Sequence, residues 1–148
     1  MEKFIFSVPE KEKNQFDTWK VLILEDDLER MKYFKTSLGP VYVEITHVET
    51  AQECIEEMQK NKFDWIFLDH DLGGEIFVDT ENKNTGSEVA RWMSDNWDRF
   101  TDSEIIIHSY NQPAARIMQG YIPGASYVPG CWMGGLQLYH KRRDKDGK

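Results

Sequence analysis

Three uninterrupted runs of apolar residues occur along the chain, at 21–24, 65–68 and 105–107, and each ends abruptly in polar or charged residues. A run without a polar alternate is typical of a strand that is buried on both faces of a parallel sheet. The carboxyl ends of parallel strands meet at one edge of an open α/β sheet, where ligands bind. We therefore expect the polar residues after the three runs to converge at that edge.

The segments between these runs follow helical and strand patterns. Apolar residues recur at helical spacing from Leu28 to Leu38, and Thr50 with Glu53 forms a capping box before a second helix. Strands that alternate with helices predict a parallel sheet with helices on both faces. The other predicted elements are a short edge strand at 4–6, strands at 41–46 and 125–128, and helices at 51–58, from Thr85 or Ser87 to Trp97, and at 114–119.

Length and composition describe a folded protein of one domain. The 148 residues are 40% hydrophobic and 30% charged, which suffices for an ordinary hydrophobic core. We expect an N-terminal extension at 1–20, the domain itself at 21–130, and a C-terminal aromatic segment with a basic tail at 131–148. Cys54 and Cys131 lack the spacing of a metal site and are expected to be free thiols.

Charge and hydropathy exclude several classes of function. The net charge of −8 disfavours general DNA binding, because a nucleic-acid backbone attracts positive charge. No apolar segment approaches the ~20 residues that span a bilayer, and Met1-Glu2-Lys3-Phe4 does not begin a long apolar signal region. We therefore expect a cytoplasmic protein without a membrane partner.

Two acidic clusters carry the candidate chemistry. Glu25-Asp26-Asp27 follows the first apolar run; Asp27 can cap the next helix, but capping explains only one of the three acids. Hard divalent cations prefer carboxylate oxygens, so a metal site is the favoured interpretation. Asp69-His70-Asp71 follows the second run, and Gly73-Gly74 then lets the backbone turn away. The long connection at 73–85 is typical of functional loops.

With these segments in view, the chain resembles the receiver domain of two-component response regulators from about residue 21 to 129. The resemblance implies a flavodoxin-like (CheY-like) α/β fold, a three-layer sandwich around a five-stranded parallel sheet of order 2-1-3-4-5. It implies that Glu25 and Asp26 bind magnesium, that Asp69 accepts a phosphoryl group, that Asp71 offers a backbone carbonyl to the metal, and that Ser109 contacts phosphoryl oxygens. It rests on the segments 21–27, 63–69, 85–88, 105–109 and 124–128.

The chain departs from ordinary receivers in two ways. Receivers carry a lysine just before a proline at the end of strand five, whereas here Tyr127-Val128 runs directly into Pro129. His70 directly follows Asp69, and His108 precedes Ser109. This pattern is similar to a variant group, the cyclic-phosphate-processing receiver domains. That resemblance implies cyclic phosphate or cyclic nucleotide substrates, in bacterial and phage conflict settings.

The two histidines support a chemical role beside the acids. Imidazole titrates near neutral pH, so His70 and His108 form a plausible general acid and base. A Mg²⁺ or Mn²⁺ ion at Glu25, Asp26 and Asp69 would replace the charge of the missing lysine. The alternatives are structural: side chains alternate along a strand, so His108 can face away from the site, and Asp71 can brace the glycine turn.

Three functions remain open from the sequence. The first is a metal-assisted hydrolase of cyclic phosphodiesters, with Asp69, His70, His108 and Ser109 as catalytic residues and Glu25, Asp26, Asp69 and Asp71 at the metal. The second is an inert pseudo-receiver that binds or inhibits a protein partner. The third is a stand-alone receiver that accepts phosphate at Asp69. The expected partner is accordingly a small phosphate-containing ligand or another protein.

Overall fold

The computed structural model describes residues 2–5, 19–37, 43–73, 79 and 81–128. Its strands are β1 (Glu2–Ile5), β2 (Trp19–Leu24), β3 (Val43–Val48), β4 (Trp65–Leu68), β5 (Glu104–His108) and β6 (Ser126–Val128). Its helices are α2 (Leu28–Ser37), α3 (Ala51–Lys60), α4 (Gly86–Asp95) and α5 (Gln112–Tyr121), with a 3₁₀ turn η1 (Trp97–Phe100). Cys131, the segment 131–148 and residues 74–78 and 80 of the predicted functional loop lie outside these residues.

The strands form one sheet of order β1-β3-β2-β4-β5-β6. The five strands from β2 to β6 are parallel, and their order is the predicted 2-1-3-4-5 when they are counted along the chain. Strand β1 adds to this sheet as an antiparallel edge strand on β3, at the place where the sequence predicted a short strand over 4–6. The predicted fold class is therefore confirmed.

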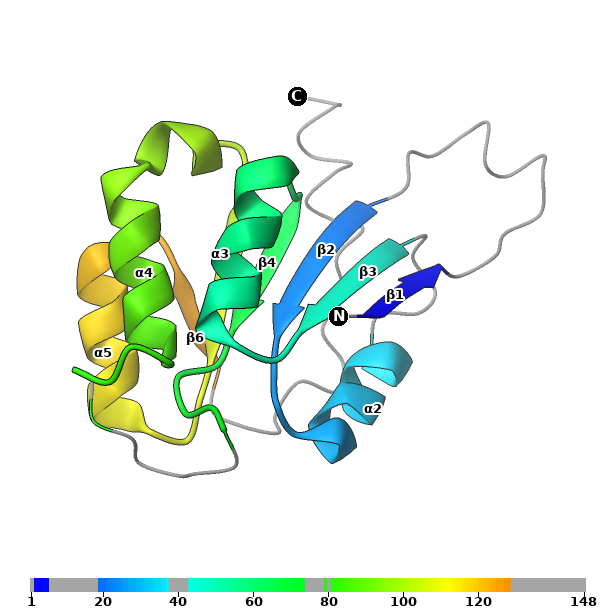
Figure 1. Ribbon diagram of the computed structural model, residues 1–148, viewed down its shortest axis with the longest axis horizontal. Coiled ribbons are helices and arrows are strands. Elements are labelled where there is room, and N and C mark those ends of the chain that lie inside the picture. Colours follow the sequence, from blue (N-terminus) through cyan, green and yellow to red (C-terminus); the bar gives the residue numbers. More distant parts are fainter. Residues whose placement is uncertain (1, 6–18, 38–42, 74–78, 80, 129–148) are drawn as a thin grey trace.

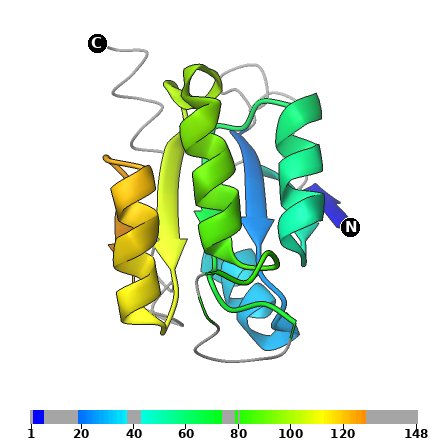
Figure 2. The same ribbon diagram turned by 60° about the vertical axis from the view of Figure 1, so that its left-hand side comes forward.

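Helices cover the sheet in two unequal layers. Helices α3, α4 and α5 stand side by side over one face (Figure 2), whereas α2 lies against the other face (Figure 1). Each layer closes its own hydrophobic cluster, because the apolar strands offer a side chain to both faces. Cys54, Met58, Val89, Met93 and Met118 pack on Leu24 and Leu68 in the first cluster. Met31 and Phe34 of α2 pack on Ile23, Phe67 and Ile106 in the second.

Side-chain caps set the helix starts. Thr50 accepts a hydrogen bond from the Glu53 amide, Thr85 from the Glu88 amide, and Asn111 from the Ala114 amide, which satisfies backbone donors that the first helical turn leaves free. Helix α2 begins at Leu28, as the spacing predicted, and the Leu28 side chain is 63% exposed. The predicted end at Trp97 was wrong, because α4 ends at Asp95 and Trp97 belongs to the 3₁₀ turn.

No helix in the described parts of the chain combines the length and the apolar composition needed to cross a bilayer. All four are ten residues long. Each instead carries polar residues on the side that faces away from the sheet. The helices are therefore covering elements of the sheet, and the site is determined by where the strands end.

Candidate functional site

Glu25, Asp69 and His108 come together at the carboxyl ends of β2, β4 and β5. In Figure 1 this is the lower edge of the sheet, where β2 leads into α2. Sheet hydrogen bonding continues into the site, because the Asp69 amide donates to the carbonyl of Leu24 (3.2 Å). One potential ligand atom from each of the three side chains lies within 4.8 Å of the others. All three side chains are buried, so the predicted convergence is observed for them.

The geometry of the strands explains why these three side chains share one face. Residues two positions earlier, Ile23 and Ile106, belong to the cluster beneath α2. Side chains alternate between the faces of a strand, so Glu25 and His108 turn to the same side. His108 packs edge-on against Phe34 of α2, with 5.0 Å between ring centroids. The candidate site therefore lies on the α2 side of the sheet.

Arg30 in the first turn of α2 links the two carboxylates. Its Nη2 donates to Glu25 Oε2 (2.9 Å) and to Asp69 Oδ2 (3.1 Å), and its Nε donates to Glu25 Oε2 (3.1 Å). Its guanidinium carbon also lies 5.7 Å from the centre of the exposed Tyr110 ring. A positive charge is thus already present between the two acids.

Burial and charge set the two carboxyl groups apart. Burial raises the pKa of Glu25, but the hydrogen bond and charge of His108, then the charge of Arg30, outweigh it and hold that pKa below its ordinary value. Burial and the neighbouring Glu25 raise the pKa of Asp69 to about 9, although Arg30 opposes them. Near neutral pH Glu25 is therefore ionised and Asp69 holds a proton.

His108 faces the cluster. Its Nε2 lies 2.9 Å from Glu25 Oε1, and an ionised carboxylate only accepts hydrogen bonds, so Nε2 carries the proton. Its Nδ1 is buried and, among the described residues, has no hydrogen-bond partner. The sequence left open whether His108 faces the site, and its contact with Glu25 answers that question.

His70 belongs to a separate hydrogen-bond network. Its Nδ1 lies 2.9 Å from Asp71 Oδ1, and the side-chain nitrogen Nδ2 of Asn111 donates to the same oxygen (3.1 Å). His70 is fully buried, and its Nε2 finds no partner within the described parts of the chain. Each histidine ring is therefore held by a different carboxylate, and His70 is not among the three clustered ligand residues.

The remaining predicted residues lie around these two networks. Asp26 is partly exposed and is not among the three clustered ligand residues. The Asp71 side chain holds His70 and Asn111. The Ser109 hydroxyl is buried and accepts a hydrogen bond from the Asn111 amide (3.0 Å).

Gly86 brings α4 unusually close to the site. Its amide donates to the His70 carbonyl (3.0 Å), and a Cβ atom at this position would lie 2.2 Å from the Asp69 carbonyl oxygen and 2.9 Å from the His70 Cα. Only a residue without a side chain allows this approach. Gly86 thus fixes the backbone that carries Asp69 and His70.

Sequence reasoning missed Arg30, Asn111 and His47. Arg30 lies in the turn directly after the acidic cluster, and this position at a helix start was an available signal. Asn111 both caps α5 and reaches Asp71. His47 lies with Nε2 at 2.6 Å from the Glu25 carbonyl oxygen and so supports the backbone of that residue.

The donor set suits a divalent cation in part. Glu25 and Asp69 provide hard oxygen atoms, the type that Mg²⁺ and Mn²⁺ prefer, and His108 adds a nitrogen. Glu25 Oε2 and Asp69 Oδ2, however, are the atoms that Arg30 contacts. The residues therefore fit a cation provided that Arg30 moves away from them.

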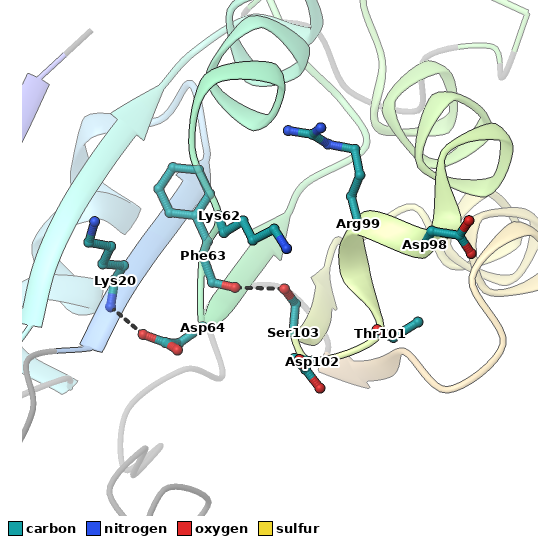
Figure 3. A pocket seen from close by; sticks show the side chains of 9 residues that line it. All are labelled: Lys20, Lys62, Phe63, Asp64, Asp98, Arg99, Thr101, Asp102 and Ser103. Atoms are coloured by element: carbon teal, nitrogen blue, oxygen red, sulfur yellow. Dashed lines mark hydrogen bonds between the residues drawn. The ribbon is translucent and has the colours of Figure 1, made fainter.

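A cavity of about 350 Å³ lies at the opposite, amino end of the strands (Figure 3). Lys62 extends across it from a wall formed by Phe63, Asp64 and Ser103. Polar side chains that line the cavity bond to backbone groups: Asp64 Oδ2 accepts a hydrogen bond from the Lys20 amide (2.8 Å), and the Ser103 hydroxyl donates to the Phe63 carbonyl (2.6 Å). This cavity contains none of the predicted site residues.

Solved structures of receiver domains share this fold. Response regulator TrrA from Thermotoga maritima, in complex with Mg(2+)-BeF, matches with a TM-score of 0.57 and 18% identity over 88% of this chain and 96% of that one. A CheY-like receiver domain from Methanospirillum hungatei matches with a TM-score of 0.55 and 18% identity, over 76% of this chain and 82% of that one. The chemotaxis protein CheY4 of Vibrio cholerae matches with a TM-score of 0.57 and 17% identity, over 76% of this chain and 86% of that one. At these identities the likeness establishes the fold alone.

Sequence comparison is more specific. Among proteins with curated descriptions, none matches the chain. A family model described as "Cyclic-phosphate processing Receiver domain" matches residues 21–123, a span that holds Glu25, Asp69, His70 and His108 and well over half of the chain. The predicted resemblance is confirmed, and the chain belongs to the family of cyclic-phosphate processing receiver domains.

Proposed function

We propose that this protein hydrolyses a phosphodiester bond in a cyclic phosphate or cyclic nucleotide, with Mg²⁺ or Mn²⁺ held by Glu25 and Asp69. One observation carries the proposal: two carboxylates and an imidazole are buried together at the carboxyl edge of the sheet. Burying two carboxyl groups and an imidazole together is costly unless a function requires it, so such clusters mark candidate sites. Membership of the family supports the substrate class.

The acids have different tasks in this proposal. Glu25 is ionised and oriented by His108, whereas Asp69 must release its proton to serve as a ligand. Asp26, at the mouth of the site, and the backbone carbonyl of Asp71 complete the proposed metal ligands. A bound divalent cation would neutralise phosphate charge and polarise the phosphoryl oxygen.

His70 is the proposed proton acceptor. A carboxylate cannot donate a hydrogen bond, so the His70 proton lies on Nδ1, toward Asp71, and the buried Nε2 is the ring atom left to accept a proton. Asp71 and Asn111 hold the ring in that orientation. On the other side of the site, His108 holds a proton against Glu25, and Ser109 is the proposed contact for phosphoryl oxygens.

The test is turnover of 2′,3′-cyclic and 3′,5′-cyclic nucleotides in the presence of Mg²⁺ or Mn²⁺. We expect His70→Gln to lower kcat by about 10²-fold or more, the usual contribution of a general base. Asp64→Asn, at the opposite end of the sheet, is the matched control and should leave kcat unchanged. Absence of turnover with every substrate and both metals would contradict the proposal.

A second candidate is an inert binding module, and one observation favours it. Arg30 already pairs with the ionised Glu25 and donates a hydrogen bond to the protonated Asp69, so the charge of the site is balanced without a ligand. An inert module would bind no Mn²⁺ and hydrolyse no cyclic phosphate. Binding of Mn²⁺ in a calorimetric titration would exclude it.

Phosphate acceptance at Asp69 is the weakest of the three functions. The raised pKa of Asp69 keeps its carboxyl group protonated, and a protonated carboxyl is a poor nucleophile. Acetyl phosphate or beryllofluoride with Mg²⁺ would test it, since Trp65 stacks on Phe67 two residues before Asp69 and would report the change by its fluorescence. We expect no response.

A further inference from the structure

Arg30 occupies the position that a cation bridging the two acids would need. Its guanidinium makes three hydrogen bonds to Glu25 Oε2 and Asp69 Oδ2 at 2.9 to 3.1 Å. Glu25 Oε2 also accepts the Asp27 amide (3.0 Å), and Glu25 Oε1 is used by His108. Asp69 Oδ1 accepts the His70 amide (2.8 Å), so a divalent ion that binds both carboxylates competes with the guanidinium for Glu25 Oε2 and Asp69 Oδ2.

The side chain nevertheless has a second place to go. Arg30 is held by the first turn of α2, its side chain is 19% exposed, and its guanidinium already lies against the Tyr110 ring at 5.7 Å. Tyr110 is 55% exposed beside Ser109. A guanidinium that leaves the acids therefore remains at the mouth of the site, on an aromatic surface that favours a cation.

We infer that Arg30 is an internal cation that a metal ion displaces, and that the displaced guanidinium binds the phosphate group of the substrate. The inference rests on the proposed function, of which it names the phosphate-binding residue. The planar guanidinium fork matches two phosphate oxygens.

This arrangement couples the two ligands. Metal binding moves Arg30 off the acids and leaves it to pair with a phosphate, while a phosphate that attracts Arg30 frees the acids for the metal. Each ligand therefore strengthens the binding of the other, and the coupling must be reciprocal. The site would assemble fully only when both are present.

The experiment is a titration of Mn²⁺ followed by electron paramagnetic resonance, with and without inorganic phosphate. Without phosphate, we expect Arg30→Gln to bind Mn²⁺ about tenfold more tightly than the wild type, because the competing charge is gone. With phosphate, we expect Mn²⁺ affinity to rise by about tenfold in the wild type and less than about twofold in the variant.

Two further variants control this comparison. Arg91→Gln removes an arginine that pairs with Glu88 and Tyr121 on α4 and α5, and it should behave as the wild type. Arg30→Lys keeps the charge but loses the fork, so it should bind Mn²⁺ weakly and lose the phosphate effect. It also tests the inference if Arg30→Gln fails to fold.

The outcomes separate the inference from the function on which it rests. Mn²⁺ binding of equal or lower affinity in Arg30→Gln overturns the role of Arg30 as a competitor. A phosphate effect that is the same in both proteins overturns its role at the phosphate. If neither protein binds Mn²⁺, the proposed metal site is wrong and the inference fails with it.

Discussion

The two ends of the sheet use polar residues in opposite ways. At the amino end, Asp64, Ser103 and Arg99 bond to backbone groups of Lys20, Phe63 and the last turn of α3. At the carboxyl end, Glu25, Asp69, His108 and Arg30 bond to each other. The first set closes loops and helix ends, whereas the second keeps ionisable groups together away from water.

In this molecule, the volume of a cavity is therefore a poor indicator of where the candidate functional site lies. The 350 Å³ cavity of Figure 3 lies at the amino end, where polar side chains bond to backbone groups. A large displacement, the raised pKa of Asp69, occurs at the other end, where burial and Glu25 act together. Perturbed buried carboxylates are the better indicator of a functional site.

The largest expected effect concerns how tightly the carboxyl end is packed. Gly86→Ala places a methyl group 2.2 Å from the Asp69 carbonyl oxygen, so α4 must move, and we expect a loss of more than about 3 kcal/mol in the free energy of unfolding. Gly120→Ala in α5 meets nothing within 4 Å and should raise stability by a few tenths of a kcal/mol or more. Urea denaturation measures both. Equal stabilities would show that the packing here is loose.

A second prediction compares acids at the two ends. Asp26→Asn should weaken Mn²⁺ binding by at least about tenfold, a loss typical even of groups that only support a ligand. Asp64→Asn retains an oxygen that can accept the Lys20 amide and should leave the affinity unchanged. Calorimetric titration gives both constants. Equal losses in the two variants would mean that Mn²⁺ binds through general negative charge.

A third prediction follows from the raised pKa of Asp69. Its folded-state pKa of about 9 lies above the unfolded value, so between about pH 4 and pH 9 only the folded chain holds this proton. Stability should therefore fall as pH rises through this window, by at most about 1.4 kcal/mol per unit. Asp69→Asn should flatten that slope in denaturation curves from pH 5 to 9. A wild-type slope of zero would contradict the protonated state.

The smallest effect is expected at the amino end. Arg99 Nη2 donates to the carbonyls of Met58 (2.6 Å) and Gln59 (3.0 Å), which are orphan groups at the end of α3. Arg99→Ala should cost about 1 kcal/mol of stability and leave Mn²⁺ affinity unaltered. Thermal unfolding measures the stability loss, and a Mn²⁺ titration measures the affinity. A change in affinity would mean that the two ends communicate.

Much of the fold followed from the apolar runs. Because residues 21–24 and 65–68 have no polar alternate, they had to be central strands, and the placement of Glu25 and Asp69 at their ends followed from parallel-sheet geometry. The absence of polar alternates also left one property of the fold unpredicted, namely which face of the sheet each side chain occupies. A strand that is apolar on both faces does not reveal which helix covers which face, so the face of His108 was open until Phe34 was located beside it.

Side-chain reach was the other limit. Arg30 lies five residues after Glu25 but 39 residues before Asp69, and no local pattern states that one guanidinium spans both. Asp26 shows the reverse case. It is adjacent to Glu25 in sequence and its charge acts on Asp69, yet its side chain is partly exposed and it is not among the three clustered ligand residues.

Asn111 sets a practical limit on mutagenesis at this edge. One side chain both caps the first turn of α5 through its oxygen (3.2 Å to the Ala114 amide) and holds Asp71 through its nitrogen. Its replacement would unravel a helix start and release the His70 ring in a single event. Inactivity of an Asn111 variant would accordingly not distinguish damaged architecture from damaged chemistry, and only substitutions such as His70→Gln, which spare the cap, can make that distinction.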